Sequence, residues 1–140
     1  RANVCQPDYV NGKANVPHPV FEFHQNLDNG PELWNLFNES GFLPYTSTFE
    51  EPSSRAHRQA MAAGCVVLYP PNMGTPSDLI TDNVDGFVRP VNEWVDIITR
   101  LSNDKEEFDR ISQNARKHAV RENWEVQAKR FNELFKGLII

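Results

Sequence analysis

The sequence predicts an α/β fold, a parallel sheet flanked by helices and followed by a helical carboxyl-terminal region. Short apolar runs alternate with helical patterns from Val20 to Pro90, the order expected for parallel βαβ units. The run from Cys65 to Tyr69 is apolar and rich in valine, as in a strand buried on both faces. We therefore predict an irregular arm at residues 1–19 and one parallel α/β domain at residues 20–140, ending in helices from about residue 92.

The first elements follow from local patterns. Prolines and an Asn-Gly pair interrupt residues 1–19, whereas residues 20–23 alternate like a short strand. Pro31 opens a helix that Gly41 ends, with Leu33, Leu36 and Phe37 as its buried stripe. Residues 42–45 form the next predicted strand, and a loop then leads to Glu51.

A helix is predicted immediately after Glu51, and Gly64 ends it. Pro52 suits the first turn, where its missing N–H costs nothing. Ser53 and Ser54 can satisfy the free N–H groups of that turn. The four alanines and one methionine that follow favour helix and allow close packing on a sheet.

Three polar residues of this segment fall on one helical face. Glu51, Arg55 and Gln59 lie four residues apart and would span about 12 Å along the axis. That length matches a sugar–diphosphate–ribose unit laid along the helix. The positive helix end, with its free N–H groups, would then face the diphosphate.

The chain after the central strand supplies a loop and three further helices. Gly74 and Thr75 belong to a loop at the predicted carboxyl end of the sheet, and Thr75 can cap a short helix. Residues 87–90 are predicted as an edge strand. The final helices are predicted at residues 92–101, 105–122 and from 123 onward. Their expected buried residues are Trp94, Val95, Ile98, Leu101, Phe108, Ile111, Ala115, Ala119, Val126, Ala128, Phe131, Leu134 and Phe135. We expect all three tryptophans, Trp34, Trp94 and Trp124, in the core.

Composition excludes several classes of function. The net charge of −5 gives no basic field for nucleic acid, and no apolar run is long enough to span a membrane. The four histidines have no metal-ligand spacing, so we expect no metal site and place these side chains at the surface. Cys5 and Cys65 are expected to be free thiols, as in a cytoplasmic protein. Peripheral contact with a membrane, through a larger parent protein, is an alternative to a purely cytoplasmic location.

Three segments resemble the retaining glycosyltransferases of the GT-B class, the "group 1" family. The family signature is a glutamate, seven residues, a second glutamate, Ala-Met-Ala-x-Gly and a hydrophobic strand. Here Glu51 and seven residues precede Gln59-Ala-Met-Ala-Ala-Gly64-Cys-Val-Val. Asp82-Asn-Val-Asp-Gly-Phe-Val88 is similar to a second family segment, and Asn114-Ala-Arg116 to a third.

The resemblance implies half of a GT-B fold, a Rossmann-like donor-binding domain. By resemblance, Glu51 contacts the donor sugar as the catalytic residue, and Gln59 takes the place of a glutamate that holds the ribose. Residues 52–55 (Pro52, Ser53, Ser54 and Arg55) would lie beneath the diphosphate, and Gly74 and Thr75 would border the donor. The partner is a nucleoside-diphosphate sugar, and neither a metal nor another cofactor is required.

The match covers less than half of a full enzyme of this class. An amino-terminal acceptor domain is missing, so we expect this chain alone to be inactive. A glutamine accepts from one ribose hydroxyl but cannot chelate two, which leaves open a degenerate, non-catalytic binding or assembly module. A different α/β enzyme that shares only the architecture is a third alternative.

Overall fold

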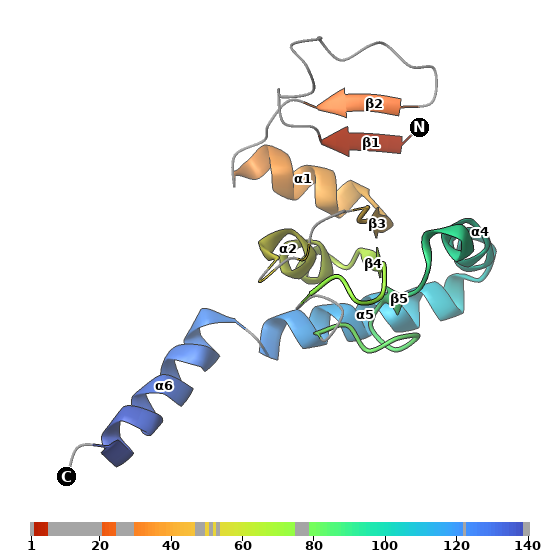
Figure 1. Cartoon of the computed structure of the whole chain (residues 1–140). Coiled ribbons are helices and arrows are strands. Elements are labelled where there is room, and N and C mark those ends of the chain that lie inside the picture. The colour runs from red at the N-terminus through yellow and green to blue at the C-terminus, as the bar shows by residue number, and fades with distance from the viewer. Residues whose placement is uncertain are drawn as a thin grey trace. The chain divides into compact units, whose positions relative to one another are not determined.

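The computed structural model describes residues 2–5, 21–24, 30–46, 50, 52, 54–74, 79–121 and 123–138, with the backbone alone for the first two ranges. The chain divides into two compact units, Arg1–Ser40 and Gly41–Ile140. Figure 1 shows the helices and strands of both.

The described residues of the first unit form a two-stranded parallel sheet and one helix. β1 (Ala2–Cys5) pairs with β2 (Phe21–His24) in parallel, so Ala2 lies opposite Phe21. The prediction of an irregular arm is therefore wrong for residues 2–5, because strand pairing with a distant segment leaves no local signature in a four-residue run. The remaining residues of that arm lie outside the described ranges.

Helix α1 (Pro31–Glu39) follows its predicted pattern closely. Pro31 is its first residue, and Phe37 is buried while Leu33 and Leu36 are half-buried. Trp34 is 36% exposed, so its predicted core position is wrong, although its ring meets the Phe37 ring edge-on with centroids 6.5 Å apart. Trp34 lies three residues before Phe37, at the edge of the stripe that Leu33, Leu36 and Phe37 form.

The second unit is built on a parallel sheet of three strands. β3 (Phe42–Pro44), β4 (Val66–Tyr69) and β5 (Phe87–Val88) lie in the order β3-β4-β5. Both pairings are parallel, with Phe42 opposite Val66 and Leu68 opposite Phe87. Every residue of β4 is buried, as predicted for a strand covered on both faces.

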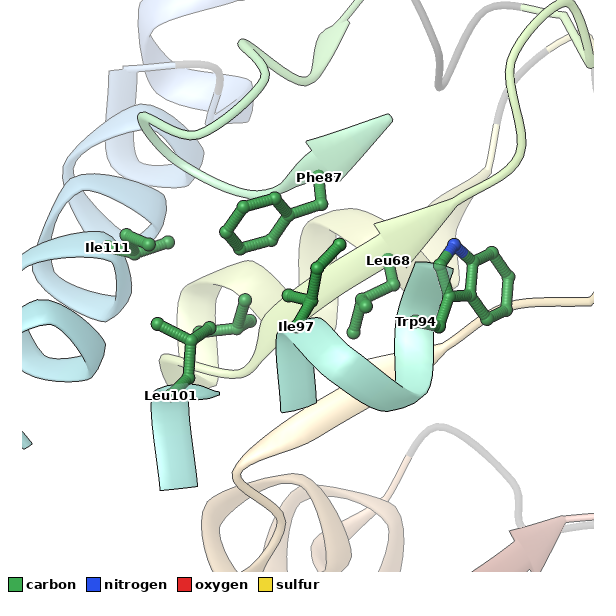
Figure 2. Packing of buried hydrophobic residues seen from close by; sticks show 7 residues of the cluster. Leu68, Phe87, Trp94, Ile97, Leu101 and Ile111 are labelled. Atoms are coloured by element: carbon green, nitrogen blue, oxygen red, sulfur yellow. The ribbon is translucent and has the colours of Figure 1, made fainter. Parts of the chain in front are cut away.

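Different helices cover the two faces of β4. Side chains alternate along a strand, so Val66 and Leu68 share one face and Tyr69 lies on the other. On the first face lies α4 (Trp94–Asn103), which follows a short 3₁₀ turn, Val91–Glu93. Its buried residues are Trp94, Ile97 and Leu101, which close over Leu68 and Phe87 in Figure 2. Each such burial stabilises the fold by roughly 1.5–3 kcal/mol.

The other face of β4 meets α2 (Arg55–Ala63), and α5 (Lys105–Arg121) packs against α2. Ile111 and Ala115 of α5 are fully buried, as predicted, and Ile111 belongs to the cluster of Leu68 and Phe87 on the first face (Figure 2). Asp104 accepts a hydrogen bond from the Glu107 N–H at 2.9 Å and so caps α5.

Several predicted core positions in the last third are wrong. Val95 of α4 is 70% exposed, because the inner face of the helix passes through Ile97 instead. Helix α6 (Trp124–Leu138) has no buried residue, although its apolar stripe was predicted to lie inside. Trp124 is 87% exposed. Amphipathic spacing shows which face of a helix is apolar, but it does not supply a surface for that face to cover.

Candidate functional site

Helix α2 begins three residues later than the sequence suggested. Ser54 occupies the N-cap position with extended backbone angles (φ −96°, ψ 116°), and Arg55 is the first helical residue. Pro52 therefore lies before the helix, at an exposed bend, and not in its first turn. The extended backbone of Ser54 is the physical reason, since it ends the helical geometry on that side.

Ser54 does not cap the helix with its side chain. Ser54 is buried, with 4% of its surface exposed, but its hydroxyl makes no capping hydrogen bond to α2. The predicted capping role is therefore wrong for Ser54, while Ser53 lies outside the described residues. The Ser54 hydroxyl consequently leaves the first-turn N–H groups of α2 to other acceptors.

The charge of α2 favours an anion at its amino end. Arg55 and Arg58 are exposed, and the nine residues of the helix include no acid. Their guanidinium charges add to the positive end of the helix dipole. Sequence reasoning did not single out Arg58, although its position three residues after Arg55 could have indicated it.

Arg55 and Gln59 lie one turn apart on α2, as the four-residue spacing predicts. Arg55 is exposed and Gln59 half-buried. Glu51 and Thr75 lie outside the described residues, as Ser53 does. The geometry of the full Glu51–Gln59 face is therefore still a prediction, and so are the assigned ligand roles.

An aromatic cluster lies where β3 and β4 end. The His57 ring from α2 meets Tyr45 with ring centroids 4.4 Å apart and Tyr69 at 4.7 Å. His57 is 2% exposed, so its predicted surface position is wrong. The missed signal was helical spacing, because His57 lies three and four residues before the buried Ala60 and Met61.

The loop after β4 is fastened to the same cluster. The Tyr69 hydroxyl donates to the Met73 carbonyl at 2.8 Å. Asn72 and Gly74 have positive φ angles of 59° and 92°, which a tight left-handed turn requires. Gly74 thus follows the carboxyl end of β4, where ligands bind in open parallel sheets.

A carboxylate–imidazole pair joins α5 to the turn before β5. His118 Nδ1 lies 2.8 Å from an Asp85 oxygen, and the other Asp85 oxygen accepts from the Thr81 N–H at 2.7 Å. His118 is therefore half-buried and paired, not the free surface side chain that was predicted. His18 lies outside the described residues, as does the side chain of His24. Asp85 is engaged at both oxygens, which indicates a structural pair.

Cys65 is excluded as a nucleophile. It is buried, and desolvation raises the pKa of its thiol to about 11, against a smaller lowering by the charge of Arg116. The thiol is therefore protonated at neutral pH, when the thiolate would be the reactive form.

Other site types have little support among the described residues. Nowhere in the described ranges do three or more histidine, cysteine, aspartate or glutamate side chains gather into a group that could hold a metal ion. None of the helices in these ranges is long and apolar enough to cross a membrane. The cavity lined by His57, Arg58, Met61, Leu79, Ile80, His118 and Ala119 holds about 10 Å³. A nucleotide cannot fit there, because small-molecule pockets occupy roughly 300–1,000 Å³. The candidate site is instead the exposed amino end of α2, a helix with two exposed arginines and no acid.

Comparison with known proteins agrees with this fold. Residues 18–118 match the sequence model of the family described as "Glycosyl transferases group 1". YtcC of Bacillus subtilis (strain 168) is 28% identical over 127 residues, which is 87% of this chain and 30% of YtcC.

Two solved structures share the architecture. HepE of Anabaena, in complex with UDP-glucose, has a TM-score of 0.69 at 22% identity, with 85% of this chain and 33% of HepE covered. The carboxyl-terminal domain of the group 1 protein LpcC from Francisella tularensis has a TM-score of 0.62 at 20% identity, with 73% and 53% covered. The chain thus spans about a third of YtcC and of HepE, and it has the Rossmann-like α/β architecture found in one half of a GT-B fold.

Proposed function

Because the chain belongs to the glycosyl transferases group 1 family, we propose that it is the donor-binding part of a retaining glycosyltransferase. The parent enzyme would move a sugar from a nucleoside-diphosphate sugar to an acceptor in glycan or glycoconjugate synthesis. The acceptor-binding domain would lie in the remainder of that parent, since the chain spans 30% of YtcC and 33% of HepE.

The amino end of α2 is the observation that carries this proposal. It lies at the carboxyl edge of a parallel sheet, because α2 follows β3 and its His57 contacts Tyr45 directly after that strand. Two exposed arginines, the lack of an acid within the helix itself and a hydroxyl that does not cap the helix all favour a bound diphosphate there. Charge-assisted hydrogen bonds from N–H groups and guanidinium to phosphate are about twice as strong as neutral ones.

The proposed roles follow the donor along α2. The first-turn N–H groups and Arg55 would hold the diphosphate, with Pro52, Ser53 and Ser54 forming the turn beneath it. Glu51 would orient the sugar hydroxyls, and Gln59 would accept from one ribose hydroxyl. The loop of Gly74 and Thr75 would border the sugar. As the nucleoside diphosphate leaves, positioned cations and N–H groups stabilise its charge.

Calorimetric titration of the folded chain tests the proposal. UDP-glucose, the ligand in the HepE complex, and a GDP-sugar serve as probes. We expect weak binding of one of them, and a further loss of affinity in Glu51→Ala. Glu125→Ala is the matched control, because Glu125 is an exposed acid in the first turn of α6. A folded sample that gives no heat with any nucleotide contradicts donor binding.

A non-catalytic binding or assembly module is the second candidate, and Gln59 is the observation that favours it. An amide can hold one ribose hydroxyl, whereas a carboxylate accepts from two. Gln59→Glu should therefore tighten nucleotide binding if this position meets the ribose. If neither the natural chain nor Gln59→Glu binds a nucleotide, that result would favour the module.

A further inference from the structure

Helix α5 closes the carboxyl end of α2. The Ser112 hydroxyl donates to the Gly64 carbonyl at 2.7 Å, and the Arg116 guanidinium donates to the Ala63 carbonyl at 2.7 Å. The last carbonyls of a helix have no partner within the helix, so side chains from a distant segment satisfy these two. Ser112 and Arg116 lie one turn apart on α5, and we call this pair the α5 clamp.

The clamp occupies space that another residue at Gly64 would fill. Gly64 has a φ of 90°, and a Cβ atom added there would lie 2.4 Å from Arg116 Nε and 2.9 Å from Ser112 Oγ. Such distances are too short for non-bonded atoms, so the turn and the clamp fit each other closely. The position of the carboxyl end of α2 is therefore defined by side chains as well as by its short connection to β4.

Near the opposite end of α2, the His57 ring contacts both Tyr45 and Tyr69, whose own rings stack on each other, so α2 has a second contact with the sheet there. Between these ends, Ala60, Met61 and Ala63 are buried in a close-packed interior, which transmits a displacement instead of absorbing it. A nine-residue helix is a rigid rod about 13 Å long, so a shift at one end moves the other.

We propose that Ser112 and Arg116 are positioning residues for the nucleotide-sugar site, which they reach through α2. This inference rests on the proposed function. The clamp sets the tilt of α2, and the tilt sets where the first-turn N–H groups and Arg55 meet the diphosphate. Hydrogen bonds to phosphate oxygens need donor–acceptor distances of about 2.7–3.2 Å and weaken steeply as their angle bends, so a small tilt alters affinity.

The same helix offers a control for ordinary structural effects. Arg110, Asn114 and His118 follow one another at four-residue spacing and meet the turn at residues 83–85. Arg110 donates to the Asn83 carbonyl and Asn114 to the Val84 carbonyl at 3.0 Å, while His118 pairs with Asp85. Asn114→Ala therefore removes one tertiary hydrogen bond of α5 without touching α2.

The test measures the dissociation constant for UDP-glucose and the melting temperature of the same variants of the full chain. Ser112→Ala and Arg116→Met should weaken binding roughly tenfold, as expected for small displacements of binding groups. Arg116→Lys keeps a donor and should recover part of the affinity. Asn114→Ala should lower the melting temperature by a similar amount yet leave binding within about twofold.

Two results overturn the inference. In the first, the clamp variants bind as tightly as the natural chain, or Asn114→Ala weakens binding as much as they do. The proposed function then stands and the positioning role is rejected. In the second, the natural folded chain binds no nucleotide, which rejects the proposed function and this inference with it. Ser112→Ala removes a single hydroxyl, so the test does not depend on a variant that fails to fold.

Discussion

Helices α5 and α6 are similar in sequence pattern but differ in what surrounds them. Both are amphipathic, with 17 and 15 residues, and each has a side-chain cap at its start. Ile111 of α5 is completely buried, whereas Phe131, Leu134 and Phe135 of α6 are all more than half exposed. The comparison shows that an apolar stripe predicts a helix more reliably than it predicts what the helix packs against.

The largest difference is expected for an aliphatic residue removed from each helix. Ile111→Ala leaves a cavity in the core and should cost roughly 2–5 kcal/mol in the free energy of unfolding. Leu134→Ala, in an exposed stretch of α6, should cost about 0.5 kcal/mol or less. Urea denaturation followed by circular dichroism measures both. Equal losses would show that the apolar face of α6 is covered within this chain.

A glycine in each region gives the next contrast. Gly64→Ala places a side chain at a positive φ angle and against Arg116, so it should cost about 2 kcal/mol or more. Gly137→Ala in α6 meets nothing within 4 Å and should raise helicity, because alanine favours a helix by about 1 kcal/mol. Far-ultraviolet circular dichroism and thermal melting separate the two. A harmless Gly64→Ala would mean that the clamp can move aside.

Loss of the cap of α5 and loss of the cap of α6 should differ in how much of the chain they destabilise. Asp104 accepts from the Glu107 N–H and Asn123 from the Val126 N–H, both at 2.9 Å. Asp104→Ala should lower the global stability by about 1 kcal/mol, since α5 is part of the core. Asn123→Ala should unwind the first turn of α6 and leave the main unfolding transition in place. Hydrogen exchange resolves this, and a global loss of protection in Asn123→Ala would contradict it.

The smallest expected effect concerns the titration of Cys65, a core residue next to Gly64 and the α5 clamp. Burial raises the pKa of Cys65 from 9.0 to about 11, so the folded state binds a proton that the unfolded state loses. The stability from this group is complete below pH 9 and is lost as the pH rises toward 11. In Cys5→Ser protein, alkylation at pH 8.5 should be much slower in the folded than in the urea-unfolded state. Arg116→Met should slow the alkylation of folded Cys65 further, because the Arg116 charge lowers the pKa of this thiol. Fast alkylation of the folded chain would contradict a buried Cys65 with a raised pKa.

Most of the sheet could be predicted from the sequence, because its central strand is defined by local composition. The β4 run and the glycine after α2 both depend on residues close in the chain, and both predictions are confirmed. β1 could not be predicted in this way, since its partner β2 begins 16 residues after β1 ends. Pairing between distant segments has no local signature in four residues.

The candidate site was predicted in part. The positive amino end of α2 follows from the helix pattern and its arginines, and the spacing of Arg55 and Gln59 is as predicted. The buried His57, the Ser54 hydroxyl that does not cap α2 and the contact of α5 with Gly64 were not predicted. Each of these depends on how two elements pack, and the roles of Glu51, Ser53 and Thr75 are still predictions.

The sequence by itself determined the order of strands and helices from β2 onward, the parallel sheet and the segment in which a donor site should be sought. Alternation, caps and glycine stops act over a few residues, so they can be read along the chain. Tertiary structure alone decided which apolar stripes are buried, which histidines are paired and what holds α2 at its carboxyl end. These outcomes depend on contacts such as that of Arg116 with Ala63, 53 residues apart, and only the folded chain brings such residues together.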